Sequence, residues 1–201
     1  MNPIFVIVVV ALWLYILSVL NRAKLEFWRY ICGAMGMFVI MLVTLDDILT
    51  KPLAQCVAAM AGIVGNITDT FVAYLKYGII FISTQTGSMS LQIDMECSGI
   101  IEILAFVSLL VFFRVYSVHE RIVVGVIGVS YILVCNALRI ILICETIHFC
   151  GTDAYFIAHT FVGRIFFYVL TVVLYFYVFT KPHIIRMKVG KFSYDNNKPS
   201  A

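Results

Sequence analysis

Charged residues are scarce in this sequence. Asp, Glu, Lys and Arg make up 12% of the 201 residues, compared with about 25% in an average soluble domain. So little charge excludes an ordinary soluble fold, and the mean hydropathy of +1.03 indicates a membrane protein. The net charge of +3 is small, which argues against nucleic acid as a partner, because phosphate binding needs many clustered cations.

Paired cysteine motifs are also missing. The six cysteines include no C-x-x-C and no Cys/His spacing typical of zinc. Cys32, Cys135 and Cys144 fall in apolar runs, where a free cysteine usually acts as a small buried hydrophobe, and Cys56 and Cys150 have no obvious partner. We therefore expect no disulfide framework, no metal site and no cofactor.

The first residues lack a basic segment and an A-x-A cleavage site, so we expect the first apolar run to be a retained span rather than a cleaved signal peptide. Runs of about 18 or more apolar residues are long enough to cross about 30 Å of hydrocarbon. The expected fold is an all-α polytopic membrane helix bundle, one membrane domain over residues 1–201. Its spans are expected at about 4–20, 30–45, 98–115, 122–144 and 159–180.

Basic residues gather in three segments, 21–29, 114–121 and the tail 181–201. Because Lys and Arg mark the cytoplasmic side, these segments are predicted inside the cell. The N-terminus and the segments 78–96 and 145–158 are then predicted outside.

The segment 53–77 combines small residues with polar ones, and we expect a helix that packs against the bundle or lies at the interface. The small residues allow helices to approach closely, whereas the polar ones make a poor lipid-facing surface. A re-entrant helix and a double crossing both stay open; an odd number of crossings would break the charge rule. The residues concerned are Ala54, Ala58, Ala61, Gly62, Gly65, Asn66, Asp69 and Lys76.

Apolar and polar residues alternate from Ser88 to Glu96, which predicts a half-buried strand. The Ile- and Phe-rich segment Gly78–Thr84 precedes it, so we expect a short β-hairpin over 78–96. The unpaired edges of a hairpin are not tolerated in lipid, and the hairpin is therefore predicted outside the hydrocarbon.

This topology brings Cys97, Arg139 and His159 to the outer ends of three spans. A Cys–His pair suits acyl transfer, because the thiolate is the nucleophile and the imidazole can protonate a leaving amine. A nearby guanidinium favours the thiolate and can hold an oxyanion or a substrate carboxylate.

Three motifs around these residues resemble those of the exosortase/archaeosortase family. Glu96-Cys97-Ser98-Gly99-Ile100 is similar to its nucleophile motif, Asn136-Ala137-Leu138-Arg139-Ile140 to its N-x-x-R-I motif, and His159-Thr160-Phe161-Val162-Gly163 to its final H-x-x-x-G motif. The similarity covers residues 53 to 180, and the short length is similar to the Gram-positive variant called XrtG.

The resemblance implies that Cys97, Arg139 and His159 are catalytic and that Glu96, Ser98 and Asn136 support them. It implies a transpeptidase that cleaves a C-terminal sorting signal of secreted proteins through an acyl-enzyme and transfers the product to an acceptor. The expected partners are this substrate, the lipid bilayer of a bacterial cell and an unknown acceptor, with the active site on the extracytoplasmic side.

Two further charged residues, Glu102 and Arg164, lie at the same depth as Arg139, each about 7–8 Å below the outer end of its span at 1.5 Å per residue. We expect Arg139 to act in catalysis and Arg164, which departs from the family pattern, to form a structural pair with Glu102. Three separate charges that line a wet cleft are the alternative.

Two other functions stay open. One is a membrane cysteine protease that releases its substrate to water. The other is a non-enzymatic transporter or assembly subunit, although a transporter usually has internal repeats and the sequence has no convincing one.

Overall fold

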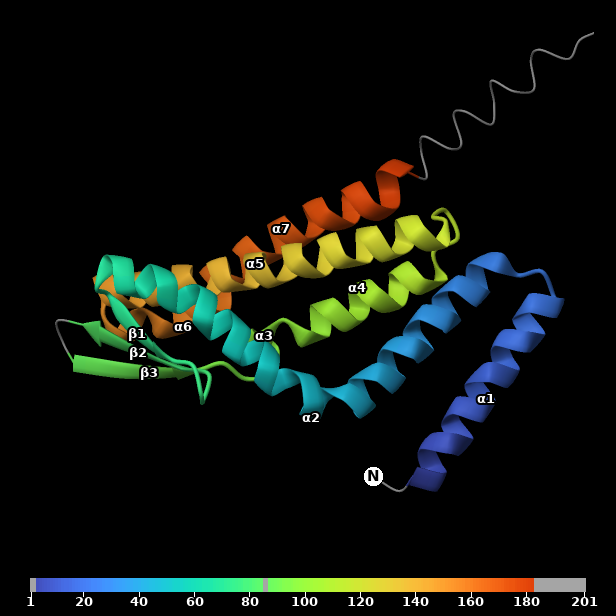
Figure 1. The fold of residues 1–201 in the computed structure, drawn as a ribbon, viewed down its shortest axis with the longest axis horizontal. Coiled ribbons are helices and arrows are strands. Elements are labelled where there is room, and N and C mark those ends of the chain that lie inside the picture. Colours follow the sequence, from blue (N-terminus) through green and yellow to red (C-terminus); the bar gives the residue numbers. More distant parts are fainter. Residues whose placement is uncertain (1–2, 85–86, 183–201) are drawn as a thin grey trace, which may run out of the picture.

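A computed structural model describes residues 3–84 and 87–182 of the chain. Figure 1 shows long helices packed side by side and a small sheet at one end of the molecule. The long helices are α1 (Pro3–Arg22), α2 (Glu26–Thr68), α4 (Ile100–Phe112), α5 (Val118–Cys150) and α7 (Gly163–Tyr175). The short elements are β1 (Phe71–Tyr74), β2 (Ile79–Thr84), β3 (Gly87–Gln92), α3 (Met95–Ser98), η1 (Thr152–Ala154), α6 (Tyr155–Ile157), η2 (Ala158–Val162) and η3 (Phe176–Thr180).

The predicted class, a polytopic helical membrane protein with a small β-structure, is confirmed. In the described part of the chain, four helical segments are long and apolar enough to cross a membrane: Glu26–Asp46, Ile48–Thr68, Val118–Cys150 and Thr152–Thr180. Ile7–Arg22 and Ile100–Phe112 are shorter apolar helices. The predicted tail lies outside the described residues from 183 onward.

Helix α2 is longer than the sequence predicted. The expected span 30–45 and the start of the expected helix 53–77 are parts of one continuous helix, Glu26–Thr68, with Pro52 inside it. Proline removes one intrahelical hydrogen bond and bends a helix without ending it. The helix is bent about halfway along its length (Figure 1), so that its second half runs beside the sheet.

The predicted helix 53–77 is wrong in its last part. Helix α2 ends at Thr68, followed by Asp69 in the left-handed conformation, and Phe71–Tyr74 is a strand instead. Strand β1 pairs antiparallel with β2, with Phe71 opposite Ile82. The predicted hairpin is therefore extended to a three-stranded sheet.

The hairpin itself was predicted with its second strand too long. Strand β3 pairs with β2 and ends at Gln92, and Met95 and Glu96 belong to the one-turn helix α3. The sheet has the order β1-β2-β3, so β3 is an edge strand. Such an edge presents unpaired backbone groups.

Two apolar clusters hold the molecule together. One joins the inner face of the sheet, including Phe71, Ile80 and Ile82, to the second half of α2 and the last turns of α5. The other joins α4, the first half of α5 and α7 around Phe106 and Phe167. The short helix α3 lies where the two clusters meet, because Cys97 belongs to the first cluster and Ile103 to the second.

Helix α5 links the two clusters. Ser117 and Glu120 form a capping box at its start, and its 33 residues correspond to about 50 Å at 1.5 Å per residue, well beyond the ~30 Å of hydrocarbon. Its last turns carry the sheet: the Thr70 hydroxyl donates to Glu145 Oε1 at 2.9 Å, and His148 Nδ1 lies 2.5 Å from the Ser83 carbonyl oxygen. The predicted loop 145–158 therefore begins as helix.

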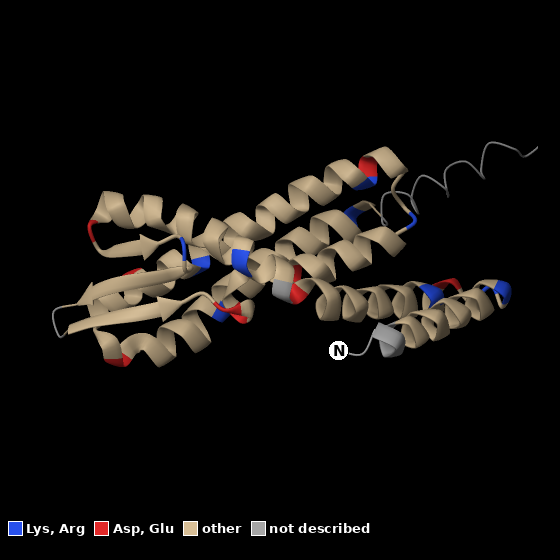
Figure 2. Cartoon of the chain, turned by 60° about the horizontal axis from the view of Figure 1, so that its bottom comes forward, with Lys and Arg blue, Asp and Glu red and all other residues tan. Residues whose placement is uncertain are grey.

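Charges are concentrated at particular levels of the molecule. Figure 2 shows lysines and arginines at the end away from the sheet and near the middle. The charged residues drawn at the far end, beside the sheet, are acidic. We call the end that contains the α1–α2 and α4–α5 connections the basic end.

Candidate functional site

Cys97 lies on the one-turn helix α3, between the edge strand and α4. Its side chain is 5% exposed. Gly99 follows in the left-handed conformation, at φ +80°, and a Cβ there would lie 3.3 Å from Asn136 Nδ2. Glycine adopts this conformation without steric cost, and the chain can therefore turn sharply from α3 into α4 two residues after the cysteine.

His159 comes from η2, a π-helical turn that precedes α7. Its Nε2 lies 3.2 Å from Cys97 Sγ, although the two residues are 62 positions apart. The ring stacks on Tyr155, with centroids 5.5 Å apart and an angle of 23° between the planes. A π-helical turn frequently marks a functional site, and here it presents the imidazole to the thiol.

Gly163 allows the helix that follows η2 to lie close to α5. A Cβ at Gly163 would lie 2.8 Å from Ile143 Cδ1. The final motif of the sequence thus has two physical parts, an imidazole at its first position and a close helix contact at its last.

Asn136 and Arg139 of α5 approach the same short helix from the other side. The buried Asn136 donates from Nδ2 to the Cys97 carbonyl oxygen at 2.6 Å. Arg139 is 5% exposed, donates from Nη1 to the Glu96 carbonyl oxygen at 3.5 Å, and its guanidinium carbon lies 5.7 Å from the centre of the Phe167 ring. Among the described residues its buried Nε has no hydrogen-bond partner, which leaves one N–H donor of this guanidinium unused.

Opposing influences act on the thiol. Burial raises the pKa of Cys97 above its usual value, and the positive charges of Arg139 and then Arg164 counteract that rise, while Asp94 and Glu96 add to it. The cationic neighbours therefore offset part of the effect of burial, and the pKa of Cys97 stays above its usual value.

The remaining predicted supporting residues are distributed differently from the expectation. Arg164 pairs with Glu96, at 3.8 Å and with both side chains largely exposed, so the predicted pair with Glu102 is wrong. Glu102 lies instead near Arg139, and its buried Oε2 has no partner among the described residues. The prediction failed because it used only the depth of each residue along its span. Two residues at equal depth pair only if their side chains also face the same neighbouring helix. Ser98 is fully buried, and its hydroxyl donates to the Met95 carbonyl oxygen at 3.0 Å.

Two aromatic residues of the site were not identified from the sequence. Tyr155 stacks on the imidazole and Phe167 lies under the guanidinium. The i, i+4 spacing of Tyr155 and His159 was a usable signal, because residues four apart share a helix face. Phe167 had no such signal, since it meets Arg139 across two helices.

A polar groove of about 390 Å³ lies beside the site, between the bend of α2, the β1–β2 turn and the segment that leads to Cys97. Lys51, Lys76 and Asp94 line it. No group of His, Cys, Asp and Glu suited to a metal ion occurs among the residues 3–84 and 87–182.

Comparison with known proteins gives one family. The family model described as transmembrane exosortase (Exosortase_EpsH) matches residues 3–176. No curated protein and no solved structure matches the chain.

Proposed function

Because this chain belongs to the transmembrane exosortase family, we propose that it is a membrane cysteine transpeptidase in which Cys97, His159 and Arg139 perform the chemistry. The substrate is a secreted protein with a C-terminal sorting signal, cleaved on the extracytoplasmic side of a bacterial membrane. The observation that carries the proposal is the 3.2 Å contact between Cys97 Sγ and His159 Nε2, with a buried guanidinium beside it.

The first half of the reaction forms an acyl-enzyme. Cys97 Sγ attacks the scissile carbonyl carbon, and the thiol proton passes to His159 Nε2. The C–N bond then breaks, the leaving amine takes this proton from the imidazolium, and a thioester remains on Cys97. The short Sγ–Nε2 distance supports this proton transfer without an intervening water.

Arg139 stabilises the negative charge that develops on the carbonyl oxygen. The backbone N–H groups of Cys97 and Ser98 already donate to the Asp94 carbonyl oxygen, at 3.0 and 2.8 Å, so they are engaged within α3. The unpartnered Nε of Arg139 is therefore the better candidate for stabilising the oxyanion.

The second half transfers the acyl group. An acceptor amine, deprotonated by His159, attacks the thioester carbon, the C–S bond breaks, and Cys97 leaves as a thiolate that regains its proton. Water in place of the amine gives hydrolysis, which is the protease alternative. A third role, as a transporter or assembly subunit, requires no thiol.

The edge of β3 is suited to hold the substrate. The Ile93 N–H donates to the Gly78 carbonyl oxygen at 2.9 Å, so alternation along an antiparallel strand directs the N–H groups of Ser88, Ser90 and Gln92 to the free edge. An extended peptide that pairs there would run toward Cys97, with side-chain pockets as the alternative basis of recognition.

A co-expression experiment tests the proposal. The reporter is a secreted protein that ends in a short motif, an apolar span and a basic tail, taken from a gene next to that of this chain. We expect processing by the wild-type chain, none by Cys97→Ala, and little by His159→Ala. Added hydroxylamine should trap the acyl group as a hydroxamate on the reporter.

Cys135→Ala is a matched control, because Cys135 is equally buried, at 3% exposure, but packs in the other cluster. It should process the reporter like the wild type. Processing by a well-expressed Cys97→Ala variant would contradict the enzyme function and favour a scaffold. Processing without hydroxamate, despite saturating hydroxylamine, would contradict the acyl-enzyme.

A further inference from the structure

Three arginines converge at the basic end of the molecule, far from Cys97. Arg29 of α2, Arg114 of the α4–α5 connection and Arg121 of α5 line one groove of about 650 Å³. The same groove is lined by Leu14, Leu17, Ser18, Asn21, Val111 and Phe112. It therefore has cations at one side and apolar walls from α1 and α4.

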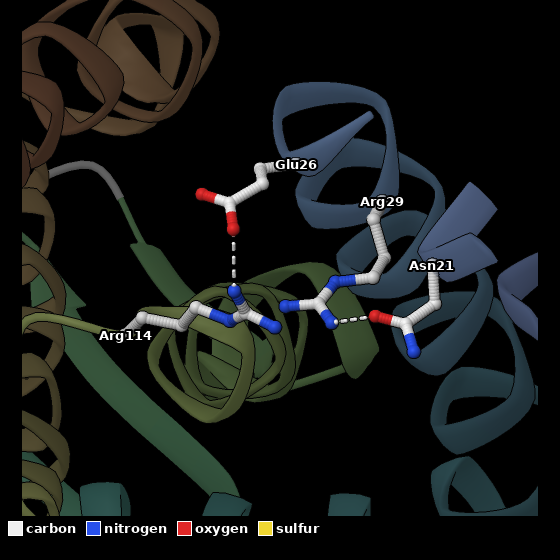
Figure 3. A network of polar contacts seen from close by, with 4 residues as sticks. All are labelled: Asn21, Glu26, Arg29 and Arg114. Atoms are coloured by element: carbon white, nitrogen blue, oxygen red, sulfur yellow. Dashed lines mark hydrogen bonds and ion pairs between the residues drawn. The ribbon is translucent and has the colours of Figure 1, made fainter. Parts of the chain in front are cut away.

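Only one of the three cations of this groove, Arg114, has a carboxylate partner among the described residues. Arg114 Nη1 pairs with Glu26 Oε1 at 2.9 Å, and Arg29 Nη1 donates to the neutral Asn21 Oδ1 at 2.6 Å. Figure 3 shows the two guanidiniums turned toward one another between these partners. Two like charges that face each other are unfavourable unless an anion lies between them.

Arg121 adds a third positive charge. Its Nη2 donates to the Phe113 carbonyl oxygen at 3.0 Å, and its buried Nε has no partner among the described residues. A guanidinium has five N–H donors, and contacts with described residues use one nitrogen on each of the three arginines. Most of the donor capacity thus remains for a ligand.

We propose that this groove binds the phosphate of an anionic membrane phospholipid. A phosphodiester accepts bidentate hydrogen bonds from guanidiniums, and the leucine and phenylalanine walls provide the surface along which an acyl chain can lie. Basic grooves between helices on the cytoplasmic side bind anionic head groups, and the distribution of Lys and Arg predicts that the basic end faces the cytoplasm. A free phosphate ion shares the head-group chemistry but has no use for the apolar walls.

The test compares lipids on the full-length protein. Wild-type protein is reconstituted in nanodiscs of phosphatidylcholine alone or with added phosphatidylglycerol, and lipid retention is measured by native mass spectrometry together with the shift of the melting temperature. We expect phosphatidylglycerol to be retained and to raise the melting temperature. Each neutralised arginine should weaken phosphatidylglycerol binding by about fivefold, since a cation near the membrane surface contributes about 1 kcal/mol.

Arg29→Gln/Arg114→Gln is the decisive variant, and Arg22→Gln/Lys24→Gln is its matched control. Both remove two positive charges from the same end, but Arg22 and Lys24 are exposed and do not line the groove. Each shift is taken relative to the same variant in phosphatidylcholine, so a change in basal stability cancels. Arg29→Lys/Arg114→Lys keeps the charge without the planar fork and should bind with intermediate strength.

Selective loss in the arginine variant supports the proposal. Equal loss in the control would overturn it, because surface charge alone would then explain binding. The same melting shift from inorganic phosphate in detergent would overturn the lipid assignment in favour of a free anion. If the wild-type protein shows no difference between the two nanodisc compositions, the proposal that the groove binds an anionic phospholipid is overturned.

Discussion

At the scale of single residues, the reactivity of Cys97 reflects a competition between burial and charge. Burial raises its pKa and Arg139 opposes that rise, so the thiolate fraction grows as the pH increases through the pKa of the thiol. Removing the guanidinium leaves the effect of burial less opposed. The pKa of Cys97 then moves further up, and less thiolate is present at neutral pH.

The first prediction concerns Arg139→Gln. The pH profile of Cys97 alkylation by iodoacetamide should move to higher pH, and reporter processing should fall by about 10²–10³, the loss typical of one oxyanion donor. Arg139→Lys should keep most of the alkylation profile but process poorly, because a point charge does not reproduce the fork. An unchanged alkylation profile in a folded Arg139→Gln variant would show that Arg139 does not lower the pKa of the Cys97 thiol.

The second prediction concerns Gly99, whose φ of +80° strains any L side chain and whose Cβ would lie only 3.3 Å from Asn136 Nδ2. Gly99→Ala should lower the free energy of unfolding by about 1–2 kcal/mol, measured by thermal unfolding in detergent. Gly125→Ala is the control, because its Cβ would meet Leu110 at an ordinary 3.4 Å and alanine favours a helix. Equal stability of both variants would argue against strain at Gly99.

At the scale of secondary-structure elements, the free edge of β3 sets the third prediction. Ser90→Pro or Gln92→Pro removes an N–H that points away from the sheet, so the fold should survive while reporter processing falls by tenfold or more. Ser90→Ala and Gln92→Ala keep the N–H and should process almost normally. If alanine and proline have equal effects, the side chains rather than the backbone recognise the substrate.

The element scale also explains why Asp94 is unsuitable for this test. The sequence extended the strand to Glu96, but Asp94 is the residue that precedes α3 and accepts from the N–H groups of Cys97 and Ser98. A proline there would constrain the backbone of the turn that holds the nucleophile, so its effect would not report on the strand edge alone. The boundary was not evident from alternation, because Met95 continues the apolar pattern into the helix.

At the scale of the whole molecule, the two exposed cysteines report on topology. Cys56 of α2 and Cys150 of α5 belong to the half of the molecule that carries the sheet, and both are exposed. The fourth prediction is that a membrane-impermeant maleimide labels single-cysteine variants at Cys56, Cys150 and Cys97 from outside the cell, with the buried Cys97 slowest. Lys24→Cys, at the basic end, should be labelled only after the membrane is opened.

Labelling of Cys56 from outside also decides the position of the second half of α2. This segment is apolar enough to cross a membrane, yet it packs on a sheet whose free edges are not tolerated in lipid. If Cys56 and Lys24→Cys are labelled from the same side, the sheet and the basic end do not lie on opposite sides of the membrane.

The sequence by itself determined the membrane class and the three motifs. Long apolar runs and motif spacings are local properties, so the apolar helices near residues 4–20 and 122–144 follow from hydrophobicity alone. The order of the spans also predicted that Cys97, Arg139 and His159 lie at the same depth, near the outer ends of three spans.

Only the tertiary structure decided how distant residues pair. It placed Arg164 with Glu96, stacked Tyr155 on His159, added β1 to the sheet and brought Arg29, Arg114 and Arg121 around one groove. These relations depend on the rotation of each helix about its axis and on contacts between residues far apart in the chain. Hydrophobicity fixes the depth of a residue along a span, and lateral packing fixes its neighbours.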